Sequence, residues 1–132
     1  MCIRDRIKAL EQPENGIIVK GFVSEEELAG LYSECRIVVV PLRYGAGVKG
    51  KVVEAIYNGA PIITTSVGAE GIPDVETVLL VEDDKQLFAE KAADLYKNPE
   101  ECLRLCRATQ EYIKKYFSID GAWSRIEEDF KR

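Results

Sequence analysis

Histidine is absent from this chain. Catalysis by Ser-His-Asp or Cys-His arrangements is therefore excluded, because both need an imidazole as the base. The four cysteines also lack the imidazole partner that completes a common zinc set.

Long apolar runs are also missing. No stretch of about 18 consecutive apolar residues occurs, so no membrane-spanning helix is expected. The first residues, Met1 to Arg6, lack the apolar core of a secretory signal peptide. We therefore expect a cytoplasmic protein, and a reducing compartment suits its cysteines. Peripheral membrane association is left open for the full-length protein only.

An excess of basic residues is absent too. The net charge is −5, which argues against broad binding to nucleic acid. The 46% hydrophobic and 31% charged residues are ordinary for a soluble globular protein. The length of 132 residues fits a single domain, 1–132, with a core of its own.

Cys102 and Cys106 are four residues apart and share one face of an expected helix. A metal site or a disulfide is one interpretation of this pair. Buried small apolar side chains are the favoured interpretation, because free cysteine is among the most buried residue types. No metal site is expected.

Strand and helix patterns alternate along the chain. The expected strands are 17–22, 36–41, 61–65 and 78–81, and the expected helices are 24–33, 49–58, about 83–97, 99–117 and 118–132. Residues 1–6 fit no element and are expected outside the fold, and residues 66–75 are expected to form a loop. Such alternation predicts an α/β fold, a parallel Rossmann-like sheet with helices on both faces.

Ligands of such sheets bind at the carboxyl ends of the strands. Three turns are expected at that edge: Phe22–Val23, 43–50 and 66–72. The richest of them is 43–50, where a glycine-rich turn follows an apolar strand and opens a helix. Backbone N–H groups at a helix N-terminus, together with the helix dipole, favour phosphate.

Several segments around this turn carry a family pattern. They are Val40-Pro41, Gly45-Ala-Gly-Val-Lys-Gly-Lys51, Glu54-Ala55, Gly59, Pro61-Ile-Ile-Thr-Thr65 and Gly68-Ala-Glu-Gly-Ile72. Together they resemble the donor-binding half of retaining glycosyltransferases with the GT-B fold, the group-one sugar-nucleotide transferases. The resemblance runs from residue 17 to about residue 130. Glu54 matches the second glutamate of the family's E-x7-E motif, and Ala46 occupies the position of the first.

The resemblance implies a nucleotide-sugar donor as substrate, with no cofactor and no metal in this domain. The implied donor-binding residues are Gly45, Gly47, Val48, Lys49, Gly50, Lys51, Glu54 and Gly68. Lys49 or Lys51 would face the diphosphate, and Glu54 would accept hydrogen bonds from the ribose hydroxyls. No catalytic residue is assigned, and nothing supports Glu70 as a base.

The resemblance also implies missing parts. The family's N-terminal acceptor domain and a first strand-helix unit are not in the sequence, so the chain looks like an incomplete C-terminal half whose sheet has lost its middle strands. We expect it to be inactive alone. Two alternatives stay open: a non-catalytic interaction module derived from this fold, which Ala46 favours, and a GT-B-fold sugar-nucleotide epimerase, which the lack of histidine disfavours.

Overall fold

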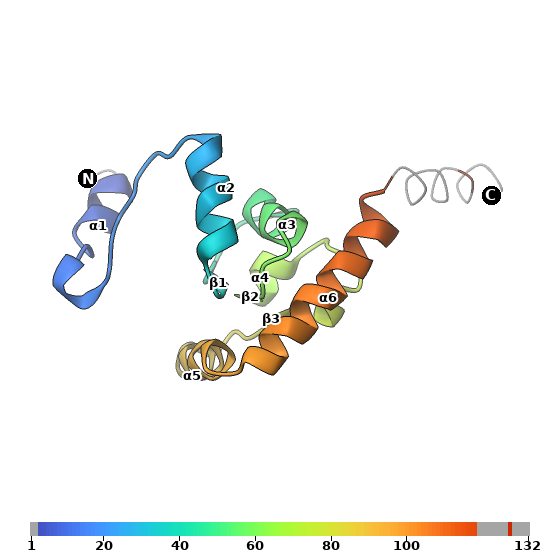
Figure 1. Ribbon diagram of the computed structural model, residues 1–132. Coiled ribbons are helices and arrows are strands. Elements are labelled where there is room, and N and C mark those ends of the chain that lie inside the picture. The colour runs from blue at the N-terminus through green and yellow to red at the C-terminus, as the bar shows by residue number, and fades with distance from the viewer. Residues whose placement is uncertain (1–2, 119–126, 128–132) are drawn as a thin grey trace. The chain divides into compact units, whose positions relative to one another are not determined.

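The computed structural model describes residues 3–118 and residue 127 (Figure 1). The chain divides into two compact units, Met1–Leu31 and Tyr32–Arg132. The C-terminal helix expected at 118–132, with Trp123, lies outside the described residues.

The first unit corrects two expectations. Helix α1 spans Ile3–Lys8, so residues 3–6 belong to an element, with basic residues in its last turn that suit the helix dipole. The strand expected at 17–22 does not form. Ile17 makes one isolated antiparallel bridge with Gln12 around the 3₁₀ turn η1, Pro13–Asn15. Among the described residues, no strand lies beside the β-branched residues after Ile17 to continue a ladder.

Helix α2, Glu25–Glu34, forms where the sequence predicts a helix. The hydroxyl of Ser24 accepts a hydrogen bond from the backbone N–H of Glu27 at 3.2 Å. This contact satisfies one of the N–H groups that have no partner inside the helix. The end of α2, from Tyr32 onward, belongs to the second unit.

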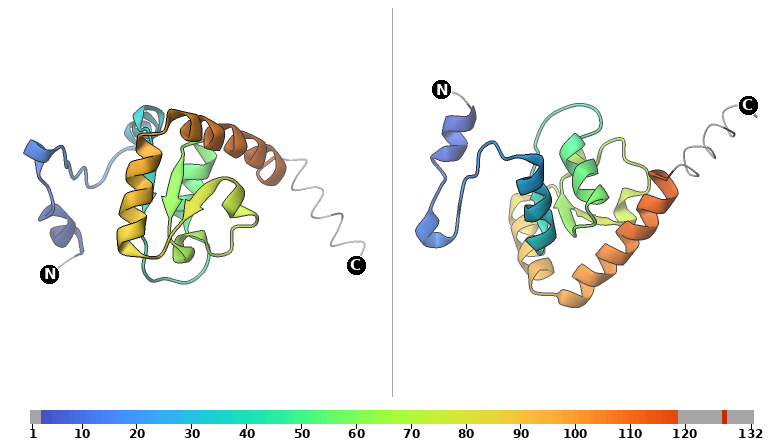
Figure 2. Two further views of the ribbon diagram at one scale, coloured as in Figure 1. Left: turned by 90° about the horizontal axis from the view of Figure 1, so that it is seen from below. Right: turned by 45° about the horizontal axis from the view of Figure 1, so that its top comes forward.

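The second unit is built on a parallel sheet of three short strands (Figure 2). They are β1 (Val38–Val40), β2 (Ile62–Thr64) and β3 (Leu79–Val81), in the order β1-β2-β3. Val39, Ile63 and Leu80 lie side by side in the register. The three strands predicted for this part of the chain are confirmed, each shorter than expected.

Helices cover both faces of this sheet. The elements around it are α3 (Gly50–Tyr57), α4 (Ser66–Ala69), the 3₁₀ turn η2 (Val75–Thr77), α5 (Lys85–Tyr96) and α6 (Pro99–Tyr116). Leu79 packs in a cluster with residues of α3, whereas the next residue, Leu80, packs against Leu95 and Leu105 of α5 and α6. Successive strand residues point to opposite faces, so the sheet is a Rossmann-like α/β layer.

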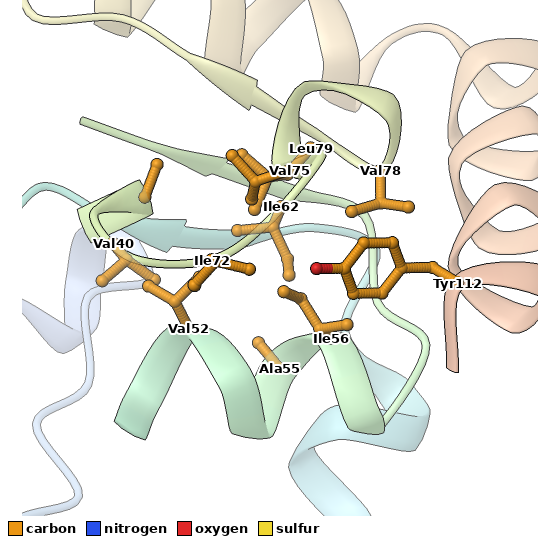
Figure 3. Close-up of a cluster of buried hydrophobic side chains, with 11 residues drawn as sticks. Val40, Val52, Ala55, Ile56, Ile62, Ile72, Val75, Val78, Leu79 and Tyr112 are labelled. Atoms are coloured by element: carbon orange, nitrogen blue, oxygen red, sulfur yellow. The ribbon is translucent and has the colours of Figure 1, made fainter. Parts of the chain in front are cut away.

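The larger core lies between α3 and the sheet. Figure 3 shows Val52, Ala55 and Ile56 of α3 pointing toward Ile62 of β2, with Tyr112 of α6 closing one side. Val52, Ile56 and Ile62 are completely buried. Burying a side chain of this size contributes roughly 1.5–3 kcal/mol, so this cluster holds α3 in a fixed position on the sheet.

The starts of α5 and α6 have side-chain caps. Asp84 accepts from the N–H of Leu87 at 2.9 Å, and Asn98 accepts from the N–H of Glu101 at 3.1 Å. Pro99 occupies the first turn of α6, as expected from its fixed φ. The segment 66–75, expected as a loop, contains the short helix α4, because Thr65 caps the N–H of Gly68.

Candidate functional site

The carboxyl ends of the three strands form one edge of the sheet, and side chains of β2 join this edge together. The hydroxyl of Thr64 donates to the carbonyl of Val40 at 2.8 Å, and the hydroxyl of Thr65 donates to the carbonyl of Leu42. The N–H of Glu82 donates to the carbonyl of Thr64 at 2.9 Å. The connections that leave β1, β2 and β3 therefore start from a rigid base.

The glycine-rich turn leaves this edge after β1 and leads into α3. Gly45 and Gly47 have φ values of +132° and +78°, a region that favours glycine. Gly50 has no such φ and is the first residue of α3. No side chain caps this helix at Lys49, so its first backbone N–H groups have no side-chain acceptor among the residues that the structure describes.

Lys49 bends back over the glycine turn. Its Nζ donates to the carbonyl of Gly47 at 2.5 Å and lies 3.6 Å from a carboxylate oxygen of Glu70. Only 14% of the Lys49 side chain is exposed, whereas 51% of the Glu70 side chain is. A Cβ added at Gly45 would lie 3.0 Å from the Lys49 Cε, so the glycine makes room for the lysine stem.

The connection after β2 reaches the same place. A Cβ added at Gly71 would lie 2.8 Å from the Cγ2 of Val48, and Glu70 pairs with Lys49. The turns 43–50 and 66–72 thus lie together, as the parallel pattern predicts. The Phe22–Val23 turn was expected with them, but no strand precedes it, and it belongs to the other unit.

Lys51 and Glu54 are exposed on α3. Neither side chain makes a hydrogen bond or ion pair with another residue in the part of the chain that the structure describes. The Tyr32 hydroxyl has its pKa raised, first by burial and second by the nearby charge of Glu54. Glu54 is therefore solvent-accessible and close enough to Tyr32, near the end of α2, to influence its pKa.

Gly68 differs from the other predicted site residues because it is buried. Its N–H donates to the Thr65 hydroxyl at 3.2 Å, and an added Cβ would lie 1.9 Å from the Thr64 Oγ1. The structure places Gly68 beneath the edge, where it lets α4 pack onto β2. Val48, by contrast, is 56% exposed at the mouth of the turn.

Asp83 was expected at the start of the helix of about 83–97, but Asp84 caps that helix, and sequence reasoning missed the contact that Asp83 makes instead. Its carboxylate accepts from the N–H of Ser66 at 2.8 Å and so fills the N-terminus of α4. Hydrogen bonds from the Ser66 backbone and side chain hold the pKa of Asp83 below its ordinary value. The sequence does show that Asp83 follows β3 closely. This position could have indicated its role, because acceptors at the carboxyl edge of the sheet lie near the starts of neighbouring helices.

Glu70 is the second missed residue. It lies within the segment that resembles the family, yet nothing in the sequence pairs it with Lys49. Glu82, next to Asp83, has its pKa lowered chiefly by a hydrogen bond from Lys91 at 2.5 Å. The edge thus carries three acidic side chains with different partners: Glu70 pairs with Lys49, Glu82 with Lys91, and Asp83 with the N–H of Ser66.

A different cavity, of about 380 Å³, lies at the amino edge of the sheet. Its lining includes Cys35, Cys102 and Cys106. Burial raises the pKa of the Cys35 and Cys106 thiols. Cys102 is buried, as expected, and its thiol donates to the carbonyl of Leu95 at 3.2 Å.

The residues that the structure describes contain no group of three or more histidine, cysteine, aspartate or glutamate side chains placed to hold a metal ion. Among the same residues, none of the helices combines the length and apolar character that crossing a membrane requires.

The sequence of this chain is similar to that of a known protein family. Residues 3–98 match the family described as Glycosyl transferases group 1. The chain is also 36% identical, over 104 residues, to an "Uncharacterized 44.6 kDa protein in cps region" of Klebsiella pneumoniae. That match covers 78% of this chain and 27% of the relative, so the chain spans about a quarter of the relative's length. No solved structure matches. The chain belongs to the group 1 glycosyltransferases.

Proposed function

We propose that this chain is the donor-binding part of a retaining glycosyltransferase, and that the start of α3 holds the diphosphate of a nucleotide sugar. One observation carries the proposal: an uncapped helix N-terminus follows a glycine turn with Lys49 and Lys51, at the carboxyl edge of the sheet of a group 1 glycosyltransferase. Backbone N–H groups, the helix dipole and two cations then converge on one anion.

The reaction explains why this charge pattern is useful. Sugar transfer breaks the bond between the sugar's anomeric carbon and the diphosphate, and forms a bond from that carbon to an acceptor oxygen. The bonding electrons stay on the diphosphate, whose negative charge grows as it leaves. Fixed donors that face this growing charge lower the barrier, and a single such donor can account for roughly 2.7–4 kcal/mol.

The two lysines contribute differently. Lys49 is held against the Gly47 carbonyl, so its charge is fixed at the turn. Lys51 is exposed in the first turn of α3 and can reach an anion by rotating its side chain. Gly47 and Gly50 leave open space in which a ligand can approach the backbone, Gly45 makes room for Lys49, and Val48 lies at the mouth of the turn.

Glu54 is proposed to bind the ribose. It lies three residues beyond Lys51 on α3, which places the two about 4.5 Å apart along the helix axis. A carboxylate has acceptor sites for both ribose hydroxyls. Its exposure leaves it open to a ligand. Gly68 is proposed to support the site from below, through its packing on Thr64.

The 132-residue chain is expected to bind a donor without transferring sugar. Holding an acceptor against the donor can account for roughly 7–11 kcal/mol of barrier reduction, and we propose that another domain of the full-length enzyme does this. The enzyme would act in the cytoplasm, without a cofactor or a metal in this domain. A sensitive assay for release of nucleoside diphosphate from nucleotide sugars should show no turnover by the chain alone.

A binding titration tests the donor site directly. Uridine, guanosine and adenosine diphosphates and pyrophosphate are titrated into ¹⁵N-labelled protein, and we expect the backbone N–H signals of residues 47–51 to shift. Lys51→Gln should weaken binding about ten-fold, the scale of one charge-assisted hydrogen bond. Lys97→Gln, at the end of α5, changes the net charge equally and should have little effect. Shifts spread over the surface, with equal losses in both variants, would refute the site.

A second candidate is a non-catalytic interaction module. Ala46, in the position of the first motif glutamate, favours it. The two functions differ in the same titration, because a module that has lost its donor site would bind none of the four anions at millimolar concentration.

A further inference from the structure

Lys49 already has a counter-ion within the chain. The Glu70 carboxylate lies 3.6 Å from its Nζ, which is too long for a strong hydrogen bond but close enough for charge attraction. The proposed donor site does not use Glu70. The Glu70 carboxylate nonetheless lies beside Lys49, the cation that is proposed to bind the diphosphate.

The backbone around Glu70 is fixed. Its neighbour Ala69 and the nearby Ile72 are buried in the larger core, with 9% and 8% of their surfaces exposed. Gly71 packs against Val48 so closely that an added Cβ would overlap with it. The loop therefore cannot swing away from the glycine turn without uncovering the core.

The Glu70 side chain, in contrast, can move. Half of it is exposed, and no hydrogen bond holds its carboxylate in the described part of the chain. Lys49 is held independently through the Gly47 carbonyl at 2.5 Å. An ammonium has three donors, so an arriving anion can replace Glu70 at Lys49 while the bond to Gly47 stays in place.

We propose that Glu70 is an exchangeable counter-ion that competes with the donor's diphosphate for Lys49, and so limits how tightly the site holds that diphosphate. The inference rests on the proposed donor site and adds a regulation of it. In the free protein Glu70 neutralises Lys49, and when a diphosphate binds, the carboxylate rotates into solvent. When the diphosphate leaves, Glu70 returns, and this return favours release of a product that two lysines would otherwise retain.

The test compares Glu70→Gln with Glu76→Gln. Both substitutions remove one negative charge, but Glu76 lies on η2 and has no contact with Lys49 in the described residues. With pyrophosphate as the probe, we expect Glu70→Gln to bind about two- to five-fold tighter than the unsubstituted chain, the scale of an exposed ion pair. Stopped-flow dissociation should slow by a similar factor, because affinity changes fall mostly on the dissociation rate.

A Lys49→Gln background separates competition from general repulsion. Without Lys49, removing Glu70 should change pyrophosphate affinity no more than removing Glu76 does. An equal gain in both backgrounds would contradict the role of the pair, and so would a loss of affinity in Glu70→Gln.

The outcomes also separate this inference from the donor site. If the unsubstituted chain binds pyrophosphate with shifts at residues 47–51, but Glu70→Gln behaves like Glu76→Gln, the inference alone is wrong. If neither the unsubstituted chain nor Glu70→Gln binds pyrophosphate or any nucleoside diphosphate, the donor site is wrong and the competition falls with it.

Discussion

Glycine is required at positions 47 and 68 for two different physical reasons. Gly47 is needed for its backbone, because its φ of +78° costs other residues roughly 1–2 kcal/mol. Gly68 is needed for its missing side chain, because Thr64 occupies the space where a Cβ would lie. The first reason can be read from a glycine-rich turn in the sequence, whereas the second depends on the packing of α4 on β2.

Gly68→Ala should destabilise the protein by about 2–3 kcal/mol. The added methyl group would displace the Thr64 hydroxyl from the Val40 carbonyl, so overpacking and a lost hydrogen bond combine. Urea denaturation measures the change. Gly30→Ala in α2 is the control, because an added Cβ there meets no atom within 4 Å, and alanine favours helix. Equal midpoints for the two variants would contradict the packing described for Gly68.

Glu54→Ala should weaken binding of nucleoside diphosphates by roughly 1–3 kcal/mol, the scale of hydrogen bonds to a charged group. Pyrophosphate affinity should stay unchanged, because pyrophosphate has no ribose for Glu54 to hold. Calorimetric titration of both ligands measures the difference. An equal effect on the two ligands would mean that Glu54 acts on the anion through its charge, and the ribose assignment would fail.

Elements with local signals were predicted well. Ser24 before α2 and Asn98-Pro99 before α6 supply caps that the sequence displays directly. The apolar runs of β1, β2 and β3 indicated strands of a parallel sheet, which the structure confirms, but β1 is less buried than its apolar run suggested, because Val39 is exposed. The connection after β2 was predicted less well. Its short helix α4 depends on Thr65, directly after the strand, whose hydroxyl accepts a hydrogen bond from the N–H of Gly68.

The strand expected at 17–22 shows the limit of such reasoning. Ile17, Ile18 and Val19 have high strand propensity, but a strand forms only beside another strand, and propensity does not reveal whether a neighbour exists. The candidate site likewise has a part that the sequence predicts and a part that it does not. Its glycine turn and helix start are local and were predicted, whereas the pairing of Lys49 with Glu70 depends on two loops meeting at the sheet edge.

The contact between Asp83 and the start of α4 contributes a stability that depends on pH. Because its folded pKa is lowered, the Asp83 carboxylate stabilises the protein fully above the ordinary aspartate range, and this stabilisation disappears as pH falls through the lowered value. Asp83→Asn should therefore lower the melting temperature near neutral pH, and the difference from the unsubstituted chain should shrink in acid. Thermal scans between about pH 3 and 7 measure it. A difference that is constant with pH would exclude the charge as the cause.

At the scale of the whole molecule, β1 is an edge strand of the sheet. Within the described residues it pairs with β2 alone, and Val39 is 45% exposed. Open strand edges favour association between chains. We expect Val39→Lys to reduce self-association in sedimentation velocity runs over a range of concentrations. Leu103→Lys on α6, at a site 52% exposed, is the control. Self-association that both variants reduce equally would point to general charge repulsion instead of the strand edge.

The cavity at the amino edge has a practical consequence. Cys35 is exposed there, at the end of the sheet away from the glycine turn. With the other cysteines replaced by serine or alanine, a maleimide on this thiol would anchor the protein to a sensor chip with its carboxyl edge facing the solution. The raised pKa of Cys35 means that such coupling proceeds faster in mildly alkaline buffer, where more of the thiol is ionised. Arrays of immobilised protein could then screen nucleotide sugars in parallel.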